Sequence, residues 1–484
     1  MKTLVIYDDT GRKSEVIEDI IGDKGFADVV VKKRCLEDYY RDEIEKIFSD
    51  VVWKKIHSAF EYSDLVRQID MYTNQDVRVI LCFSNYIVSD ADIAKLSFEK
   101  LSYIEEPFGA FDGTRAVAAM FPNVESFISF CKNVIAGRRP WDLVKEMPER
   151  FNIAGMVDIG IISNFIQCVT GNFDSRYFNS LNGNEYTLVK SSTNKKKIKA
   201  EYDFYHLLPD DMKYWFVMPF DYKEDDTKAS YTMERLHMTD LAIKWVHGSM
   251  DASEFEELLD KYFFFFKSRH KKECTKEEYA SVADALYVNK VKSRIEELKK
   301  LPQYAQIQAM LSVKGDVTVD SILERYFALK EKIESKNKYP QELVIGHGDP
   351  CFANVLYNKS TQMLKFIDPK GASTEADLWT NPYYDVAKLS HSVCGKYDFF
   401  NNGLFDIRVS EDFSYDLEIP FDNREYVKIF RKKLEENGFD YLTVRIYEAS
   451  LFISMLPLHI DNPHKVLGFI LNSDRILKEI EADV

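Results

Sequence analysis

The sequence lacks the features that would place it outside the ordinary globular proteins. Its 484 residues contain 7 cysteines, an odd number with no closely spaced pair, which argues against a disulfide scaffold or a zinc ribbon and indicates reduced thiols. No apolar run approaches the ~20 residues of a spanning helix, and the start of the chain turns acidic too soon for a secretory leader. We therefore expect a cytoplasmic protein with no membrane segment.

The chain also lacks a broad basic surface. Its formal net charge is -15, and its basic residues are scattered apart from the short run Lys195–Lys197, so we expect no nucleic-acid partner. Hydrophobic residues make up 45% of the chain, enough for two to four cores. The sequence gives no indication of the oligomeric state.

Residues 1–140 alternate short β-rich runs with helical patterns, which predicts an α/β domain, Rossmann-like or nucleotidyltransferase-like. The Gly- and Pro-containing stretch 136–152 is expected to be the boundary. From about 155 to 236 the pattern predicts a small antiparallel sheet with one helix, including a hairpin at Asn182-Gly183. Residues 237–484 are predicted to be mainly helical.

The segment "VIGHGDPCFANVLYNKSTQMLKFIDPKG" places chemically useful side chains at fixed intervals. Phosphoryl transfer from a nucleotide requires a carboxylate for the attacking hydroxyl and oxygen ligands for Mg²⁺. Asp349 is the candidate base, while Asn354 and Asp368 are the candidate metal ligands, brought to one edge by a predicted hairpin. His347 is interpreted as structural, because a second base beside Asp349 is unnecessary.

Upstream, Lys190 lies in a predicted strand and Glu201 in the following helix, a spacing that allows a Lys–Glu pair beside the phosphates. Taken alone this pair is a weak signal, since both residue types are common. It gains weight from its place ahead of the segment that contains Asp349.

These motifs together resemble the aminoglycoside phosphotransferase and choline kinase group of the protein-kinase-like fold. "HGDPCFAN" is similar to its catalytic loop, "IDPKG" to its metal-binding segment and "NPYYDVAKL" to a downstream segment. The resemblance implies an α+β, bilobal fold with a helical substrate lobe, using ATP and Mg²⁺.

The resemblance also implies roles for single residues. Asp349 would be the base, Asn354 and Asp368 the Mg²⁺ ligands, and Lys190 the phosphate-binding lysine with Glu201 as its partner. Asp385 would support the catalytic loop together with His347. The hinge that contacts adenine would comprise Met233, Glu234 and Leu236.

The sequence departs from the family pattern in two places. Lys370-Gly371 replaces the usual acidic end of the metal motif, and the glycine-rich loop is reduced to Gly171. The first change would alter the charge of the pocket, and the second affects how the triphosphate is covered.

Three functions compete. The first is an ATP-dependent small-molecule kinase whose acceptor hydroxyl belongs to a sugar, polyol or amino alcohol, as in bacterial surface-polysaccharide biosynthesis. The second is a protein kinase, which is disfavoured by the long helical stretch between hinge and loop and by the absence of an activation-segment motif after Asp368. The third is a catalytically weak or dead scaffold.

The first 140 residues faintly resemble nucleotidyltransferases, which would make the chain a bifunctional enzyme. The first strand is, however, followed by Asp8 and Asp9, which would repel a triphosphate, in place of a phosphate-cradling loop. A degenerate domain without catalytic activity is therefore expected. If the domain is active instead, its activity is expected to depend on Asp8, Asp9 or Asp90. An acidic loop of this kind could instead hold a metal.

Overall fold

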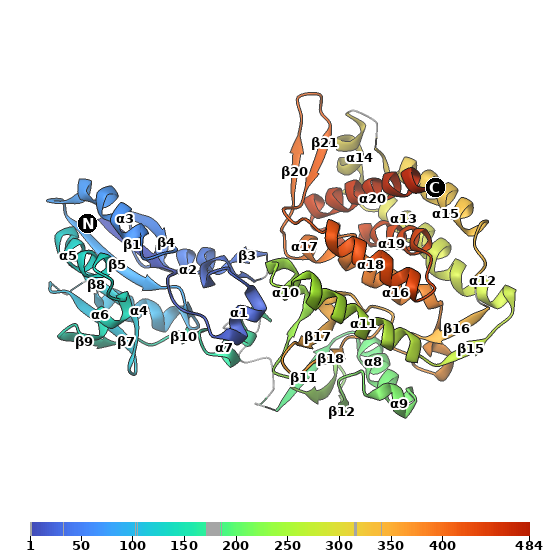
Figure 1. Ribbon diagram of the computed structural model, residues 1–484, viewed down its shortest axis with the longest axis horizontal. Helices are drawn as coiled ribbons and strands as arrows, with labels where there is room; N and C mark the ends of the chain where they lie inside the picture. Colours follow the sequence, from blue (N-terminus) through green and yellow to red (C-terminus); the bar gives the residue numbers. More distant parts are fainter. Residues whose placement is uncertain are drawn as a thin grey trace. The chain divides into compact units, whose positions relative to one another are not determined.

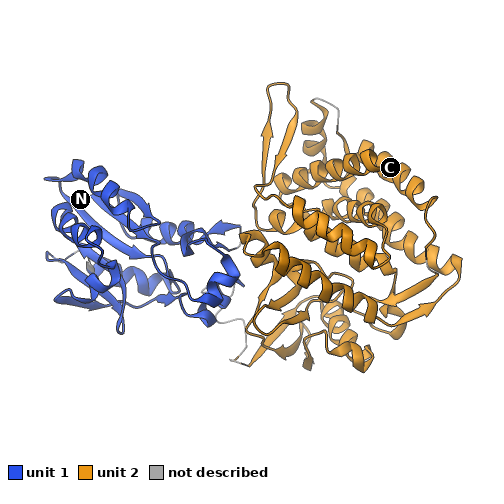
Figure 2. Ribbon diagram, in the orientation of Figure 1, with its two compact units in different colours: residues 1–181 blue, residues 182–484 orange. Residues whose placement is uncertain are grey.

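The computed structural model describes residues 2–31, 33–101, 103, 105–170, 184, 186–313, 317–339 and 341–484. The hairpin expected at Asn182-Gly183 and the loop containing Gly171 lie outside these residues. The chain divides into two compact units, Met1–Leu181 and Asn182–Val484 (Figure 2).

The first unit is built on one six-stranded sheet. Its strands, in spatial order, are β4 (Val51–Ile56), β1 (Lys2–Asp8), β5 (Val77–Phe83), β8 (Arg115–Phe121), β7 (Phe108–Asp112) and β9 (Glu149–Asn152). β1 pairs in parallel with both β4 and β5, while β8 runs antiparallel to β5. Residues 3–8 of β1 are all buried, as expected for a central strand covered on both faces.

Helices α1 to α7 belong to the described part of this unit (Figure 1). They are α1 (Glu15–Ile21), α2 (Leu36–Glu45), α3 (Glu61–Ile69), α4 (Ala91–Leu101), α5 (Val124–Ile135), α6 (Pro140–Lys145) and α7 (Ile162–Val169). The short strands are β2 (Val30–Val31), β3 (Arg34–Cys35), β6 (Tyr86–Val88) and β10 (Met156–Asp158).

The first unit is longer than the expected range 1–140. β9 pairs with β7 in the main sheet, and β10 pairs with β6, so the expected boundary at 136–152 falls inside the unit. The Gly and Pro of that stretch have local roles instead. Gly137 takes a left-handed φ of 95° after α5, and Pro140 is the first residue of α6.

The second unit begins with a three-stranded antiparallel sheet in the order β11 (Thr187–Ser192), β13 (Ala229–Glu234), β12 (Pro219–Glu224). Helix α8 (Lys195–Leu207) packs on this sheet, and α9 (Asp210–Lys213) follows. β12 begins only at Pro219, because the preceding residues form a turn in which Phe216 bridges to Phe366.

The rest of this unit is mainly helical around one large core (Figure 1). Its helices are α10 (Leu241–His247), α11 (Ala252–Ser268), α12 (Lys276–Asp284), α13 (Lys290–Lys299), α14 (Tyr304–Ser312), α15 (Val319–Glu334), α16 (Pro382–Val393), α17 (Tyr397–Asn401), α18 (Arg424–Glu436), α19 (Tyr441–Met455) and α20 (Pro463–Asp483). Its short strands are β14 (Thr239–Asp240), β15 (Lys271–Glu273), β16 (Glu342–Ile345), β17 (Val355–Asn358), β18 (Met363–Phe366), β19 (Trp379–Thr380), β20 (Asp406–Val409) and β21 (Tyr415–Glu418).

The mixed α and β composition expected from the sequence is confirmed. Among the described residues, no helix combines the length and the apolar character needed to cross a bilayer.

Candidate active site

The loop after β16 is held by a buried carboxylate. Asp385, in the first turn of α16, accepts hydrogen bonds from the backbone N–H of His347 at 2.9 Å and of Gly348 at 2.8 Å. Arg269 pairs with the same carboxylate at 3.1 Å, and both side chains are almost completely buried. A charged acceptor satisfied by two amides and a guanidinium fixes the backbone immediately ahead of Asp349.

His347 connects this loop to the next strand. Its Nδ1 accepts the backbone N–H of Asp349 at 3.0 Å, so the proton is on Nε2, which donates to the Ile367 carbonyl at 2.9 Å. Burial lowers the pKa of His347, against the opposing pull of nearby carboxylates such as Asp385. The imidazole is therefore neutral and ties the loop to the segment that contains Asp368.

The carboxylate of Asp349 meets a lysine that the sequence analysis did not single out. Lys388 Nζ lies 2.8 Å from Asp349 Oδ1, and the lysine side chain is 12% exposed. Burial raises the pKa of Asp349, but the ammonium of Lys388 outweighs it and the net pKa is below the usual value. Lys388 stands three residues after Asp385 on α16, so both side chains lie on one face of the helix. From this face Asp385 holds the loop backbone and Lys388 pairs with Asp349.

Asn354 and Asp368 are brought together by the β17–β18 hairpin, as expected from the sequence. The Asn354 side-chain amide donates to the Asp349 carbonyl at 2.9 Å, and its backbone carbonyl accepts the Ile367 N–H at 3.0 Å. This use of the amide nitrogen leaves the Asn354 Oδ1 as an acceptor oxygen. Asp368 takes a left-handed φ of 54°, an uncommon conformation for a residue other than glycine.

Lys190 on β11 joins the small sheet to this loop. Its Nζ lies 2.7 Å from Glu201 Oε2 and 2.7 Å from Asp368 Oδ1. Burial pulls the pKa of Lys190 down, but Asp368 and Glu201 outweigh burial and the net pKa is raised. Glu201 is 3% exposed and also accepts a hydrogen bond from the Tyr231 hydroxyl at 3.1 Å, which fixes the glutamate. Lys190 is therefore held between Glu201 and Asp368.

A narrow pocket lies beside this ion pair. Residues from α8, the small sheet and the segment around Asp368 line it: Glu201, Phe204, Tyr205, Phe216, Val217, Pro219, Tyr231, Met233, Phe366, Ile367, Asp368 and Pro369. Met233, one of the residues expected at the hinge, is therefore part of the lining. Glu234 at the end of β13 is exposed, and Leu236 just beyond it is partly buried.

The departure at Lys370-Gly371 has a packing explanation. A side chain at Gly371, which has a φ of 91°, would come within 2.9 Å of the Ala200 backbone on α8. The Lys370 N–H donates to the His347 carbonyl at 2.9 Å, and a Cβ at Gly348 would lie 2.6 Å from that of Lys370. The segment after Asp368 is thus packed between α8 and the loop after β16.

Comparisons with known proteins find little. No protein-family model and no curated protein matches the chain. Among solved structures, the chain is similar to the apo form of a thermostable mutant of the aminoglycoside phosphotransferase APH(4)-Ia, with a TM-score of 0.35 and 12% identity. The likeness covers 60% of this chain and 87% of that one. These comparisons give no support to the nucleotidyltransferase likeness expected for residues 1–140.

Proposed function

We propose that the second unit is an ATP-dependent kinase that phosphorylates a hydroxyl group of a small molecule. The observation that carries the proposal is the position of Lys190, 2.7 Å from both Glu201 and Asp368. A lysine fixed between a helix glutamate and a loop aspartate is what a nucleotide kinase uses to bind the donor phosphates next to the metal.

Each residue of the site has a step to perform. Lys190 would bind the donor phosphates, while Asn354 Oδ1 and the Asp368 carboxylate would hold Mg²⁺, which prefers such oxygen ligands. Bound there, Mg²⁺ would neutralise charge on the transferred phosphoryl group. Asp349 would accept the proton of the attacking hydroxyl, and its lowered pKa keeps it ionised at neutral pH.

The charges nearest Asp349 favour a neutral or anionic acceptor over an amino alcohol. Lys388 is paired with Asp349, and Lys290 on α13 donates to the Tyr384 hydroxyl at 2.9 Å and also lowers the pKa of Asp349. Two ammonium groups beside the base would repel a cationic acceptor. Sugars and polyols are therefore the acceptors to test first.

The test is transfer of the γ-phosphate of ATP to a panel of sugars, sugar phosphates, polyols and amino alcohols, in the presence of Mg²⁺. We expect a phosphorylated product with at least one sugar or polyol, and far slower transfer by the Asp349→Asn protein. Binding of Mg-ATP without transfer or hydrolysis would favour the scaffold alternative. Transfer to added proteins alone would favour a protein kinase.

A further inference from the structure

The first unit carries a second group of polar side chains, where its parallel strands end. β4, β1 and β5 lie side by side, and the chain passes from β1 to β4 on one side and then back to β5 on the other side of β1. Ligands of open α/β sheets bind at the carboxyl ends of strands at such a point. Here the residues directly after the strands are Asp9 beyond β1, His57 beyond β4 and Ser84 beyond β5.

Asp9 is buried with half of its carboxylate unused. Its Oδ1 accepts from the Ser84 hydroxyl at 2.5 Å and from the Ala27 N–H at 3.2 Å. Among the described residues its Oδ2 has no hydrogen-bond partner, although the side chain is only 1% exposed. A buried acceptor without a partner has lost its hydration with no hydrogen bond in return, so an oxygen of this kind points to a ligand.

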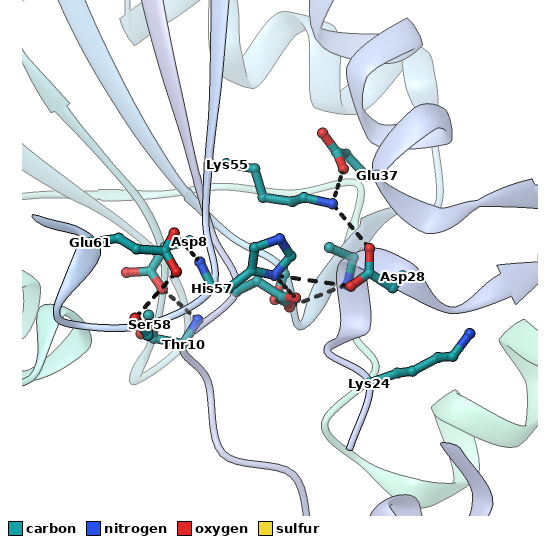
Figure 3. Close-up of polar contacts among 12 residues, drawn as sticks. Asp8, Thr10, Lys24, Asp28, Glu37, Lys55, His57, Ser58 and Glu61 are labelled. Atoms are coloured by element: carbon teal, nitrogen blue, oxygen red, sulfur yellow. Dashed lines mark hydrogen bonds and ion pairs between the residues drawn. The ribbon is translucent and has the colours of Figure 1, made fainter. Parts of the chain in front are cut away.

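That orphan oxygen points toward two further metal-ligating side chains. His57 Nδ1 lies 3.6 Å from Asp9 Oδ2. The same nitrogen lies 4.0 Å from Asp28 Oδ2, and Figure 3 shows His57 facing Asp28. One ligand atom from each of the three residues lies within 4.8 Å of the others. On the remaining side Gly25 closes the site, because a Cβ there would lie 1.8 Å from Asp9 Oδ2.

The spacing of these atoms suits a shared ion better than direct contact. Hydrogen-bonded N···O pairs lie near 2.9 Å, so atoms 3.6 and 4.0 Å apart do not satisfy each other. Ligands bound at about 2.1 Å in tetrahedral geometry are about 3.4 Å apart. Small side-chain movements would therefore place an ion between Asp9, Asp28 and His57.

The three side chains are also positioned by their own neighbours. Asp28 ends a short turn, Phe26–Asp28, and Lys55 binds its Oδ1 at 3.0 Å, on the other side from His57. The backbone N–H of His57 donates to Glu61 at 3.2 Å (Figure 3).

Asp8, the neighbouring acid, takes no part in this group. Its Oδ1 accepts the Thr10 N–H at 2.8 Å and its Oδ2 accepts the Tyr62 hydroxyl at 2.6 Å, so both oxygens are already satisfied.

We propose that Asp9, Asp28 and His57 form a binding site for a divalent transition-metal cation such as Zn²⁺ or Mn²⁺. One imidazole nitrogen and two carboxylate oxygens suit these ions, whereas Mg²⁺ and Ca²⁺ prefer oxygen alone. The side chains of His57 and Asp28 are 48% and 39% exposed, so the ion would keep a coordination position open to water or to an anionic ligand. The site is separate from the Mg²⁺ ligands proposed for the kinase.

The test measures metal binding by the full-length chain after EDTA treatment. The chain carries Asp368→Ala and no nucleotide is added, so that the proposed kinase site binds little of the added metal. Calorimetry with Zn²⁺ and Mn²⁺ should show one cation per chain. His57→Ala and Asp9→Asn should each weaken binding by at least about 100-fold, because even outer-shell partners contribute about 10–100-fold. The visible spectrum of bound Co²⁺ should report an imidazole ligand that His57→Ala removes.

The matched control is His270→Ala. His270 is another exposed histidine beside a carboxylate, but it contacts Asp211 directly at 3.0 Å. In the described part of the chain no third metal-binding side chain joins this pair. This variant should bind the cation like its parent. Because His57 is partly exposed, His57→Ala should fold even if Asp9→Asn does not, and circular dichroism checks this. No stoichiometric binding, or equal affinity in His57→Ala, would overturn the proposal.

Discussion

Both units place carboxylates just beyond buried strands, but they neutralise them differently. In the second unit Asp349 is paired with Lys388 and Asp368 with Lys190, each lysine coming from a different element. Lys388 lowers the pKa of Asp349 and so keeps that carboxylate ionised at neutral pH, which suits a base.

In the first unit neutral donors replace the lysines. Asp8 is satisfied by a tyrosine hydroxyl and a backbone amide, and Asp9 by a serine hydroxyl on one oxygen only. Burial raises the pKa of both acids. The position of an aspartate at the end of a strand therefore does not show what the aspartate does. The charge and the number of the groups that bind its carboxylate are more informative.

The substitution with the largest expected effect is Asp349→Asn. We expect loss of transfer by about 100-fold to 10,000-fold, the usual contribution of a general base, with nucleotide affinity within several-fold of wild type. The reason is that Asp349 would contact the acceptor hydroxyl and not the donor. Steady-state kinetics and calorimetry measure the two quantities. A variant that keeps more than a tenth of the wild-type rate would argue against Asp349 as the base.

Asp368→Ala should affect binding and chemistry together. The substitution removes the carboxylate that we propose binds Mg²⁺, and it leaves Lys190 paired with Glu201 alone. We expect Mg-ATP affinity and activity each to fall by about tenfold or more. Titration calorimetry with ATP, with and without Mg²⁺, separates the two contributions. Unchanged Mg-ATP affinity would place the metal elsewhere.

Lys388→Met tests whether a lysine sets the working pH of the base. Lys388 lowers the pKa of Asp349, so its removal should raise that pKa and move the acid limb of kcat/KM to higher pH. We expect the loss of kcat/KM to be greatest at the acid end of the profile and to shrink toward pH 8. Lys290→Met is the control, with a smaller shift because Lys290 binds the Tyr384 hydroxyl rather than Asp349. An equal loss at every pH would contradict this role.

Sequence reasoning succeeded where partners are linked by short, regular elements. Lys190 and Glu201 lie on a strand and the helix that follows it, and Asn354 and Asp368 flank one hairpin, so spacing alone brings each pair together. Lys388 could not be found this way. Its contact with Asp349 depends on how α16 packs against the loop after β16, although its place one turn after Asp385 was a usable signal.

Long-range packing also explains why the end of the first unit could not be predicted. Whether β9 joins a sheet made earlier in the chain is a long-range pairing that local composition does not determine, so Gly137 and Pro140 were read as a boundary. The metal-ligating group was equally hidden. Asp28 and His57 reach Asp9 only through the turn after α1 and the end of β4.

The smallest expected effect compares the two adjacent acids of the first unit in metal-free buffer. Asp8→Ala leaves the Tyr62 hydroxyl and the Thr10 amide without their acceptors, and should cost about 1–3 kcal/mol of local stability. Asp9→Asn keeps an oxygen for Ser84 and removes a buried charge, so we expect a change within about 0.5 kcal/mol. Native-state hydrogen exchange of the β1 amides measures both changes in stability.

Added Zn²⁺ should then protect the β1 amides from exchange in the wild type but not in Asp9→Asn, because only the intact carboxylate offers the ion its free oxygen. Equal destabilisation by the two substitutions without metal would mean that Asp9 is a structural acid like Asp8, and the contrast between them would disappear.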